Sequence, residues 1–288
     1  MGDTVLITGG AGFIGRYVAR ALIERGDRVR VLDSLIEQVH GDRKVPDGLH
    51  PDTELVVGDV RDEAAVTGAL AGVDKVVHLA AEVGVGQSMY AVDRYVSVND
   101  LGTAVLFQQL IAKPVKRVVV ASSMSIYGEG LYRRSVGSTV VDAVRRRDRL
   151  ERGEWEPEPG LEPLPTPESK TPSLASVYAL TKYDQERLCL IWGGAYDVPT
   201  TALRFFNVYG PRQALSNPYT GVLAIFTARL LNGRAPLLYE DGAQRRDFVS
   251  VHDVAVACRL ALESDGAAGR AVNVGSGRAA SVREIALL

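Results

Sequence analysis

The chain has 288 residues, of which 46% are hydrophobic and 24% charged, and its net charge is −2. Such a composition excludes disordered, collagen-like and fibrous chains, and the length favours one large domain or one and a half. The small net charge gives no reason to expect binding to nucleic acid or to an acidic membrane surface.

The sequence also lacks the marks of export and of metal binding. No apolar run reaches the roughly 18 residues that span a bilayer, so we expect no membrane segment. The first residues show no basic flank and no cleavage site, so we expect no signal peptide. Cys189 and Cys258 fit thiols of a reducing compartment, which predicts a cytoplasmic protein. The four histidines have no metal-ligand spacing, so we expect no metal site.

The first half of the chain alternates short β-branched runs with longer amphipathic stretches. The pattern predicts helices over residues 14–24, 63–71 and 99–112, and strands over residues 4–7, 28–32, 54–57, 75–78 and 117–121. Most of the strand runs are apolar at consecutive positions, as expected where helices cover both faces of a parallel sheet. Strand–helix alternation predicts a doubly wound α/β fold.

A helix over residues 178–196 and a strand over 200–203 complete this pattern, and beyond Asn207 the elements shorten. Residues 129–172 show little periodicity: six of the 13 prolines fall between Pro157 and Pro172, and basic residues cluster at 145–149. A loop of this length inside a domain is either functional or mobile. We therefore leave open a lid over the pocket and a solvated insertion without chemistry.

A glycine motif follows the first strand and opens the first helix. Gly9 permits the tight turn, Gly12 lets backbone approach a pyrophosphate, and Gly15 allows close packing of the helix. The N–H groups at Phe13 and Ile14 would face the phosphates at the positive end of the helix. The bland alternative is a glycine-rich turn with no ligand.

An acid at the end of the second strand completes the dinucleotide fingerprint. Asp33 would accept hydrogen bonds from both ribose hydroxyls and repel a 2′-phosphate, which favours NAD over NADP. Asp59, next to Val60, would accept from the adenine amino group or cap the helix that starts at Glu63. The small residues that follow the fourth strand suit backbone lying close to the cofactor, and they are Leu79, Ala80 and Ala81.

The motif assigns a domain organisation. We expect residues 1–206 to form a Rossmann domain that binds NAD, with an insertion at about 129–172. Residues 207–288 should form mainly a smaller, interleaved substrate-binding domain, with 247–263 returning to the Rossmann domain.

Tyr178 and Lys182 lie four residues apart and share a helical face. A lysine ammonium favours the phenolate and lowers the pKa of the tyrosine, which makes a plausible general base for an alcohol that loses hydride. Ser123, at the carboxyl end of a strand, would hydrogen-bond the substrate hydroxyl. Taken alone, each pattern also fits a helix surface or turn chemistry.

Taken together, these motifs resemble an extended short-chain dehydrogenase/reductase of the nucleotide-sugar epimerase/dehydratase family. Further motifs carry the resemblance: Val98-Asn99-x-x-Gly102-Thr103, Ser-x-Ser-Ile-Tyr-Gly at 123–128, and Arg204-Phe-Phe-Asn-Val-Tyr-Gly-Pro211.

The resemblance implies that Tyr178 is the base, that Lys182 binds the nicotinamide ribose and tunes Tyr178, and that Ser123 and Ser125 contact the sugar. It further implies that Asn99 and Phe206 line the cofactor, and that Asn207 and Arg246 hold the pyrophosphate of a nucleotide-diphosphate sugar. A guanidinium suits a diphosphate, although Arg246 would equally pair with Asp247 or Asp253. A homodimer is the family habit, with residues 103–111 and 185–192 as candidate faces.

The family's reactions share oxidation of the sugar at C4 and differ in the fate of the ketone. Dehydratases carry an Asp-Glu pair, and decarboxylating relatives a Glu, just before the Tyr-Gly of the serine motif, where this chain has Ser125 and Ile126. Neither residue shuttles a proton as a carboxylate does. The prediction is therefore 4-epimerisation, with a 4,6-dehydratase and a non-catalytic NAD-sensing protein as alternatives; the nucleotide and the sugar stay open.

Overall fold

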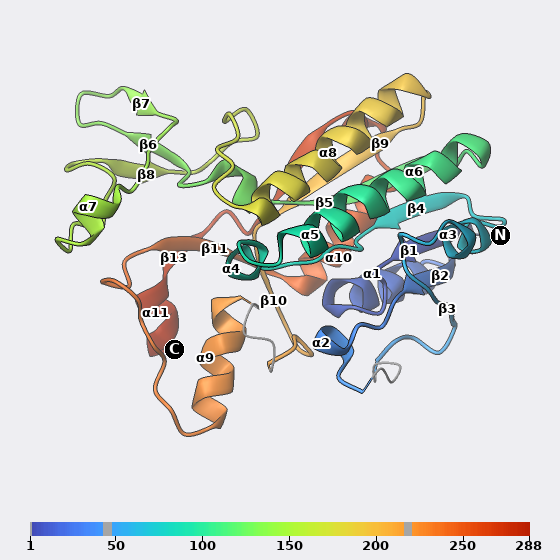
Figure 1. Ribbon diagram of the computed structural model, residues 1–288, viewed down its shortest axis with the longest axis horizontal. Coiled ribbons are helices and arrows are strands. Elements are labelled where there is room, and N and C mark those ends of the chain that lie inside the picture. Colours follow the sequence, from blue (N-terminus) through green and yellow to red (C-terminus); the bar gives the residue numbers. More distant parts are fainter. Residues whose placement is uncertain (1, 43–47, 216–220) are drawn as a thin grey trace.

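A twisted parallel sheet forms the centre of the computed structural model, which describes residues 2–42, 48–215 and 221–288 (Figure 1). The strand order is β12-β9-β5-β4-β1-β2-β3, and every pair in the sheet is parallel. The strands are β1 Thr4–Thr8, β2 Arg28–Asp33, β3 Thr53–Val57, β4 Lys75–His78, β5 Arg117–Ser123, β9 Thr200–Phe205 and β12 Ala271–Val274.

Helices cover both faces of this sheet and bury two apolar cores. α1 (Phe13–Glu24) and α10 (Val251–Ala261) pack against each other on one face. α3 (Glu63–Ala69), α6 (Gly102–Ala112) and α8 (Val177–Ala195) cover the other. Because both faces are covered, every residue of β1, β5 and β9 is buried, which explains the continuous apolar runs in the sequence. The predicted doubly wound α/β fold is confirmed.

The connection after β3 crosses over β1 to reach β4, so that β1 and β4 are neighbours with helices on opposite faces. In open α/β sheets ligands bind at such a switch point, outside the carboxyl ends of the strands. The segments that leave β1 and β4 here are the glycine motif and Leu79-Ala80-Ala81.

Shorter helices connect the strands of the first domain. They are α2 Glu37–His40, α4 Val85–Ser88, α5 Val92–Tyr95, the π-helix η1 Val96–Leu101, and the 3-10 helices η2 Met124–Tyr127 and η3 Asp265–Ala267. α5, η1 and α6 follow one another, so the predicted helix over 99–112 begins earlier and contains a π-helical turn. None of the helices within the described ranges is both long and apolar enough to cross a membrane.

The chain after β9 contributes both to a small sheet and to the main sheet. β10 (Asn207–Tyr209), β11 (Arg245–Ser250) and β13 (Ala279–Ser281) form a small sheet, flanked by α9 (Val222–Leu231) and α11 (Val282–Leu287). α10 packs on α1, in the region that the sequence analysis returns to the Rossmann domain. β12 was not predicted from the sequence, and it joins the edge of the main sheet beside β9.

The insertion has secondary structure that its sequence pattern does not predict. β6 (Leu131–Arg133) pairs with β7 (Thr139–Val140) and β8 (Glu162–Leu164), and α7 (Arg147–Leu150) lies beside them at the left of Figure 1. Strands of two or three residues are too short to show periodicity. A cluster of four buried residues forms its core: Tyr132, Val140, Ala143 and Leu161.

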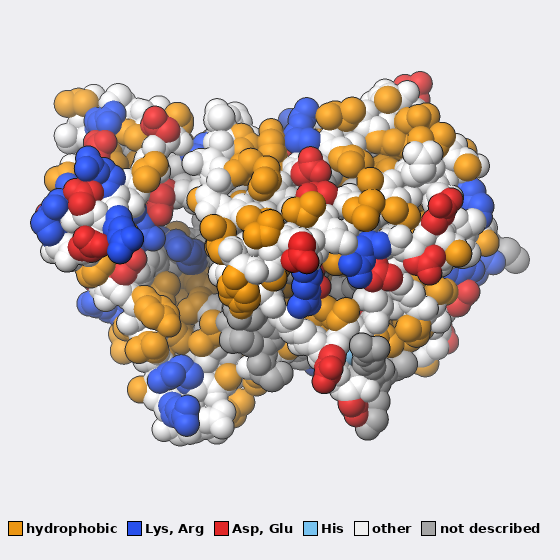
Figure 2. Space-filling view, viewed as in Figure 1, with side chains coloured by type: hydrophobic (Ala, Val, Ile, Leu, Met, Phe, Trp, Pro, Cys, Tyr) orange, Lys and Arg blue, Asp and Glu red, His pale blue; other side chains and the backbone are white. Residues whose placement is uncertain are grey.

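One arginine joins the insertion to the segment ahead of β11. Arg145 pairs with Glu129 at the start of the insertion (Nε–Oε1 2.8 Å) and with Glu240 ahead of β11 (Nη1–Oε2 2.7 Å). Between the insertion and the Rossmann domain the surface is hollowed, and Lys and Arg side chains are visible inside the hollow (Figure 2).

Candidate active site

The glycine motif builds a turn that leaves room for a ligand. Gly9 has φ +67°, and a Cβ there would lie 2.8 Å from the backbone N of Ala80. A Cβ on Gly12, in contrast, would meet within 4 Å only the carbonyl oxygen of Gly9, at 3.2 Å. Gly12 is also the N-cap of α1 and offers no side chain to its first N–H groups. An open, uncapped helix N-terminus fits an anionic diphosphate.

Asp33 lies beside this turn with its carboxylate held in place. Oδ2 accepts from the backbone N of Ala11 (3.0 Å), and Oδ1 accepts from that of Leu35 (2.9 Å). His40 approaches Oδ1 at 3.5 Å. A carboxylate accepts about four hydrogen bonds, so capacity for a ribose diol is left, and the negative charge disfavours a 2′-phosphate.

The structure excludes one of the two roles predicted for Asp59. The N-cap of α3 is Asp62, whose side chain accepts from the backbone N of Ala64 and Ala65, so the alternative that Asp59 caps this helix is wrong. Asp59 pairs with Arg61 instead (Oδ2–Nη2 2.6 Å), which holds the pKa of its carboxyl low. Adenine recognition by Asp59 stays a prediction. The neighbouring Val60 is buried, and Leu79, Ala80 and Ala81, just after β4, are half-buried.

Tyr178, at the start of α8, and Ser123, at the end of β5, share a hydrogen bond between their side chains. Ser125 donates to the Ser123 Oγ from both its backbone N (3.1 Å) and its hydroxyl (2.9 Å), which leaves the proton of Ser123 for Tyr178. The Tyr95 ring meets the Tyr178 ring edge-on at 6.3 Å. Ser176 caps the helix by accepting from the backbone N of Ala179 and so fixes the turn that carries Tyr178.

The prediction that Lys182 lowers the pKa of Tyr178 is wrong for this structure, in which the pKa is raised. Burial raises this pKa, and the hydrogen bond from Ser123 opposes the rise because it stabilises the phenolate. Lys182 lies one helical turn further on and is 3% exposed; burial lowers its own pKa to about 8. An ammonium near its titration point is suited to an electrostatic role at neutral pH.

Asn99 is fully buried and its amide is used within the protein. Nδ2 donates to the Thr181 Oγ1 (2.9 Å) and the Glu82 carbonyl (3.2 Å), and Oδ1 accepts from the Glu82 backbone N (2.7 Å). In this structure Asn99 therefore joins the loop after β4 to the start of α8, and its predicted contact with the cofactor stays a prediction. The residue that sequence reasoning missed is Gln185, which accepts a hydrogen bond from Lys182.

The predicted pyrophosphate residues lie on the small C-terminal sheet. Asn207 Nδ2 donates to the Asp247 carbonyl (3.0 Å) and joins β10 to β11, while the preceding Phe206 packs on the apolar core. Arg246 is exposed and makes no ion pair with Asp247 or Asp253, although all three lie in the described part of the chain. Asp247 instead accepts from the backbone N of Ser276 (2.7 Å) and of Gly277 (2.8 Å).

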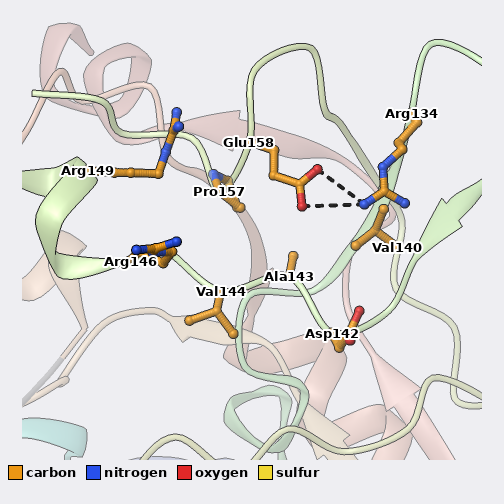
Figure 3. A pocket seen from close by; sticks show the side chains of 9 residues that line it. All are labelled: Arg134, Val140, Asp142, Ala143, Val144, Arg146, Arg149, Pro157 and Glu158. Atoms are coloured by element: carbon orange, nitrogen blue, oxygen red, sulfur yellow. Dashed lines mark hydrogen bonds and ion pairs between the residues drawn. The ribbon is translucent and has the colours of Figure 1, made fainter.

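A separate cavity lies inside the insertion and is not this site. It has a volume of about 420 Å³, and Figure 3 shows the side chains that line it. Each of its arginines has a carboxylate partner, so the cavity has no spare positive charge: Arg134 pairs with Glu158, Arg146 with Asp148, and Arg149 with Glu154. No group of three or more metal-ligating side chains occurs in residues 2–42, 48–215 and 221–288.

Comparison with known proteins matches residues 5–275 to the NAD dependent epimerase/dehydratase family. A dTDP-L-rhamnose 4-epimerase from Burkholderia thailandensis is 39% identical over 290 residues, covering 99% of this chain and 80% of the relative. A UDP-glucose 4-epimerase from Thermotoga maritima, solved with UDP-glucose, is 31% identical with a TM-score of 0.80, over 99% of this chain and 80% of that one. A UDP-glucose 4-epimerase from Thermus thermophilus, solved with NAD, is 32% identical with a TM-score of 0.75, over 99% and 81%. The chain therefore belongs to the NAD-dependent epimerase/dehydratase family of nucleotide-sugar enzymes, and its cofactor is NAD.

Proposed function

We propose that this protein is an NAD-dependent nucleotide-sugar 4-epimerase that works through a transient 4-keto sugar. The observation that carries the proposal is the hydrogen-bonded pair Tyr178–Ser123, one helical turn from a buried lysine and next to the switch point of the sheet. The 4-epimerase name of the Burkholderia relative supports the same reaction.

The cofactor site would use the turn and the strand ends described above. The helix N-terminus at Gly12, Phe13 and Ile14 would bind the diphosphate, since it is uncapped and a Cβ at Gly12 would meet only the Gly9 carbonyl oxygen within 4 Å. Asp33 would accept from the adenosine ribose, and Lys182 would bind the nicotinamide ribose. When bound, NAD supplies the hydride acceptor for sugar C4 and afterwards the hydride donor.

The chemistry assigned to the protein is proton transfer at the C4 oxygen. Tyr178 would take the hydroxyl proton as C4 is oxidised and return it after the ketone has turned its other face. Ser123 would orient that oxygen, because its hydroxyl already lies within hydrogen-bond reach of the phenol. The positive charges of Lys182 and of an oxidised nicotinamide both favour the phenolate, against the effect of burial.

The serine segment argues against dehydration. Loss of water from C5 and C6 requires a further acid and base. Residues 122–128 contain no carboxylate, Ile126 is fully buried, and Ser125 donates both its N–H and its hydroxyl to Ser123. Returning the hydride to C4 requires only Tyr178, so this residue set supports epimerisation.

For the substrate we propose a nucleoside diphosphate sugar whose diphosphate binds Asn207 and Arg246. Arg246 is exposed on β11, a strand of the small C-terminal sheet. A guanidinium not paired with the nearby Asp247 is available for a bidentate contact with phosphate oxygens.

We further infer a homodimer formed through the helices on one face. Exposed apolar side chains gather there: Leu101 and Ile111 lie on η1 and α6, and Leu180 and Ile191 lie on α8 (Figure 2). Aliphatic side chains exposed by 42–63% on adjacent helices are typical of an oligomer interface. Light scattering should give twice the chain mass, and Ile191→Glu should reduce it to a monomer; an unchanged mass for Ile191→Glu would exclude this face.

A panel of UDP-, dTDP-, GDP- and CDP-sugars tests the reaction. Incubation of each with the purified protein should yield the C4 epimer by NMR, with deuterium placed at C4 retained in the product. A 4-keto-6-deoxy product with solvent hydrogen at C5 would make the protein a dehydratase. Binding of NAD without turnover of any sugar in the panel would favour a non-catalytic protein.

A further inference from the structure

A chain of buried hydrogen bonds runs from the first strand to the ammonium of Lys182. The Thr8 Oγ1 lies 2.7 Å from the His78 Nδ1, and the His78 Nε2 lies 2.9 Å from the Thr103 Oγ1. The Gln185 Nε2 donates to the same Thr103 oxygen (2.8 Å), and the Lys182 Nζ donates to the Gln185 Oε1 (2.7 Å). None of the five side chains is more than 3% exposed.

The direction of each hydrogen bond in this chain follows from that of the Thr103 hydroxyl. The Thr103 hydroxyl donates to the Asn99 carbonyl, so its oxygen accepts the other two bonds. His78 is neutral because burial lowers its pKa to about 3. Its Nε2–H therefore donates to Thr103, and its Nδ1 accepts from the hydroxyl of Thr8.

This polarity fixes the orientation of the Gln185 amide. Its nitrogen lies beside the His78 Nε2 (3.3 Å) and faces two oxygen acceptors, the Thr103 Oγ1 and the Ala80 carbonyl at 3.4 Å. A rotated amide would place its oxygen against these acceptors and its NH₂ against the ammonium. Only the observed orientation presents the Oε1 to Lys182, and this is the one hydrogen bond that Lys182 makes in the described ranges of the chain.

We propose that Gln185 is a positioning residue, whose locked carbonyl oxygen keeps the Lys182 ammonium charged and fixed in one place. The inference deepens the proposed function, since it explains how a buried lysine stays available to tune the general base.

The surroundings of Lys182 show why such a partner is needed. Burial disfavours the ammonium, while the charges of Glu186 and Asp100 act in the opposite direction. Among these, Glu186 is already committed to a bidentate pair with Arg204. Gln185 is the group that contacts the Nζ directly, and a hydrogen bond to the charged form of a titrating group favours that form.

The sequence makes a direct test practical because the chain has only six lysines. Protein labelled with ¹³C at the lysine Cε should give six resonances, and Lys182→Arg identifies the one from Lys182. In the wild type this resonance should titrate with a midpoint of about 8.

Gln185→Met keeps the length of the side chain and removes the acceptor. The Lys182 midpoint should then fall by about one pH unit. Gln185→Glu supplies a charged acceptor and should raise the midpoint above that of the wild type. Gln108→Met, at an exposed position of α6, is the matched control and should leave it unchanged. A Lys182 midpoint that stays at the wild-type value in Gln185→Met would overturn the proposal; if that variant does not fold, an unmoved midpoint in Gln185→Glu would do so.

The activity measurement is separate. In Gln185→Met the alkaline limb of the pH–kcat profile should move to lower pH, with kcat lower by about twofold at pH 7 and by about tenfold at pH 9. A purely structural role would lower kcat without moving the limb. If the wild type epimerises no sugar, the proposed function fails, whereas the NMR titration still decides the role of Gln185.

Discussion

Arg204 and Glu186 form a bidentate ion pair inside the protein, with Nη2–Oε1 at 2.6 Å and Nε–Oε2 at 2.9 Å. Their side chains are 7% and 1% exposed. Ser122 donates to the Glu186 Oε2 (2.6 Å), and Arg204 Nη1 donates to the Tyr127 hydroxyl (2.7 Å). The pair thus joins strand β9, helix α8 and the serine segment, close to the residues proposed to be catalytic.

Arg204→Met should destabilise the protein by about 3–5 kcal/mol, because it leaves the Glu186 carboxylate buried without its partner. Denaturant unfolding of both forms measures the difference. The double variant Arg204→Met/Glu186→Leu should recover much of the loss, since two apolar side chains replace the pair without an uncompensated charge. A double variant as unstable as Arg204→Met would show that the charge is not the cause.

Tyr178→Phe should lower kcat by about 10²–10⁴-fold, the usual contribution of a general base, while NAD stays bound. Turnover of the best sugar of the panel and the NAD content of the purified protein are the two readouts. Tyr183→Phe, on the same helix, is the matched control and should leave both unchanged. Retention of wild-type kcat by Tyr178→Phe would remove Tyr178 from the mechanism.

Substitutions at two glycines of the motif should affect different properties of the protein. Gly12→Val should leave the melting temperature of the NAD-free protein nearly unchanged, because the Cβ meets only the Gly9 oxygen, but should weaken NAD binding by about 1–3 kcal/mol through overpacking. Gly15→Ala should instead destabilise the fold, since its Cβ would lie 2.5 Å from the Gly10 Cα. Calorimetric titration with NAD and thermal melts separate the two effects. Equal destabilisation by Gly12→Val and Gly15→Ala would contradict the view that Gly12 borders the cofactor site.

Asp100→Asn should stabilise the protein more strongly at alkaline than at acid pH. Burial and the nearby Asp184 raise the pKa of Asp100 to about 7, and its Oδ1 has no hydrogen-bond partner within the described residues. Because this folded-state pKa lies above the ordinary value of 3.8, stability is greatest below that value and is lost as pH rises to about 7.

Replacing the carboxylate by an amide removes this loss. The melting temperature of Asp100→Asn should exceed that of the wild type by about 2–4 °C above neutral pH, if roughly 1 kcal/mol is recovered, with a smaller gain near pH 5. Thermal melts at the two pH values measure the gain, with Asp93→Asn on the exposed side of α5 as control. An equal gain at both pH values would mean that the titration of Asp100 is not its source.

The sequence predicts best what local backbone geometry dictates. The apolar runs of the buried strands place β1 to β5 within one or two residues, and the glycine motif predicts the turn at Gly9 because few other residues adopt a positive φ there. The helix that carries Tyr178 and Lys182 also follows from its own pattern.

What sequence patterns did not predict depends on contacts between distant segments. The insertion forms a sheet through pairing of very short strands, and β12 depends on the edge of β9 for its partner. The role of Gln185 is invisible in its helical spacing, because it arises only when His78 and Thr103 from other elements pack against it. Asp62 and Asp59 are both acids ahead of a helix, and only the backbone shows which one caps it.

Helix α8 bears Tyr178 and Lys182 on its first turns and Glu186 one turn later, where the ion pair anchors it to the sheet. Tyr178, Lys182 and the ion-paired Glu186 thus belong to one continuous helix, so a displacement of Glu186 also displaces the other two. Directed evolution for thermal robustness that alters this anchor would consequently also shift the phenol relative to the sugar, whereas stabilising changes confined to the outlying insertion would leave the reaction undisturbed.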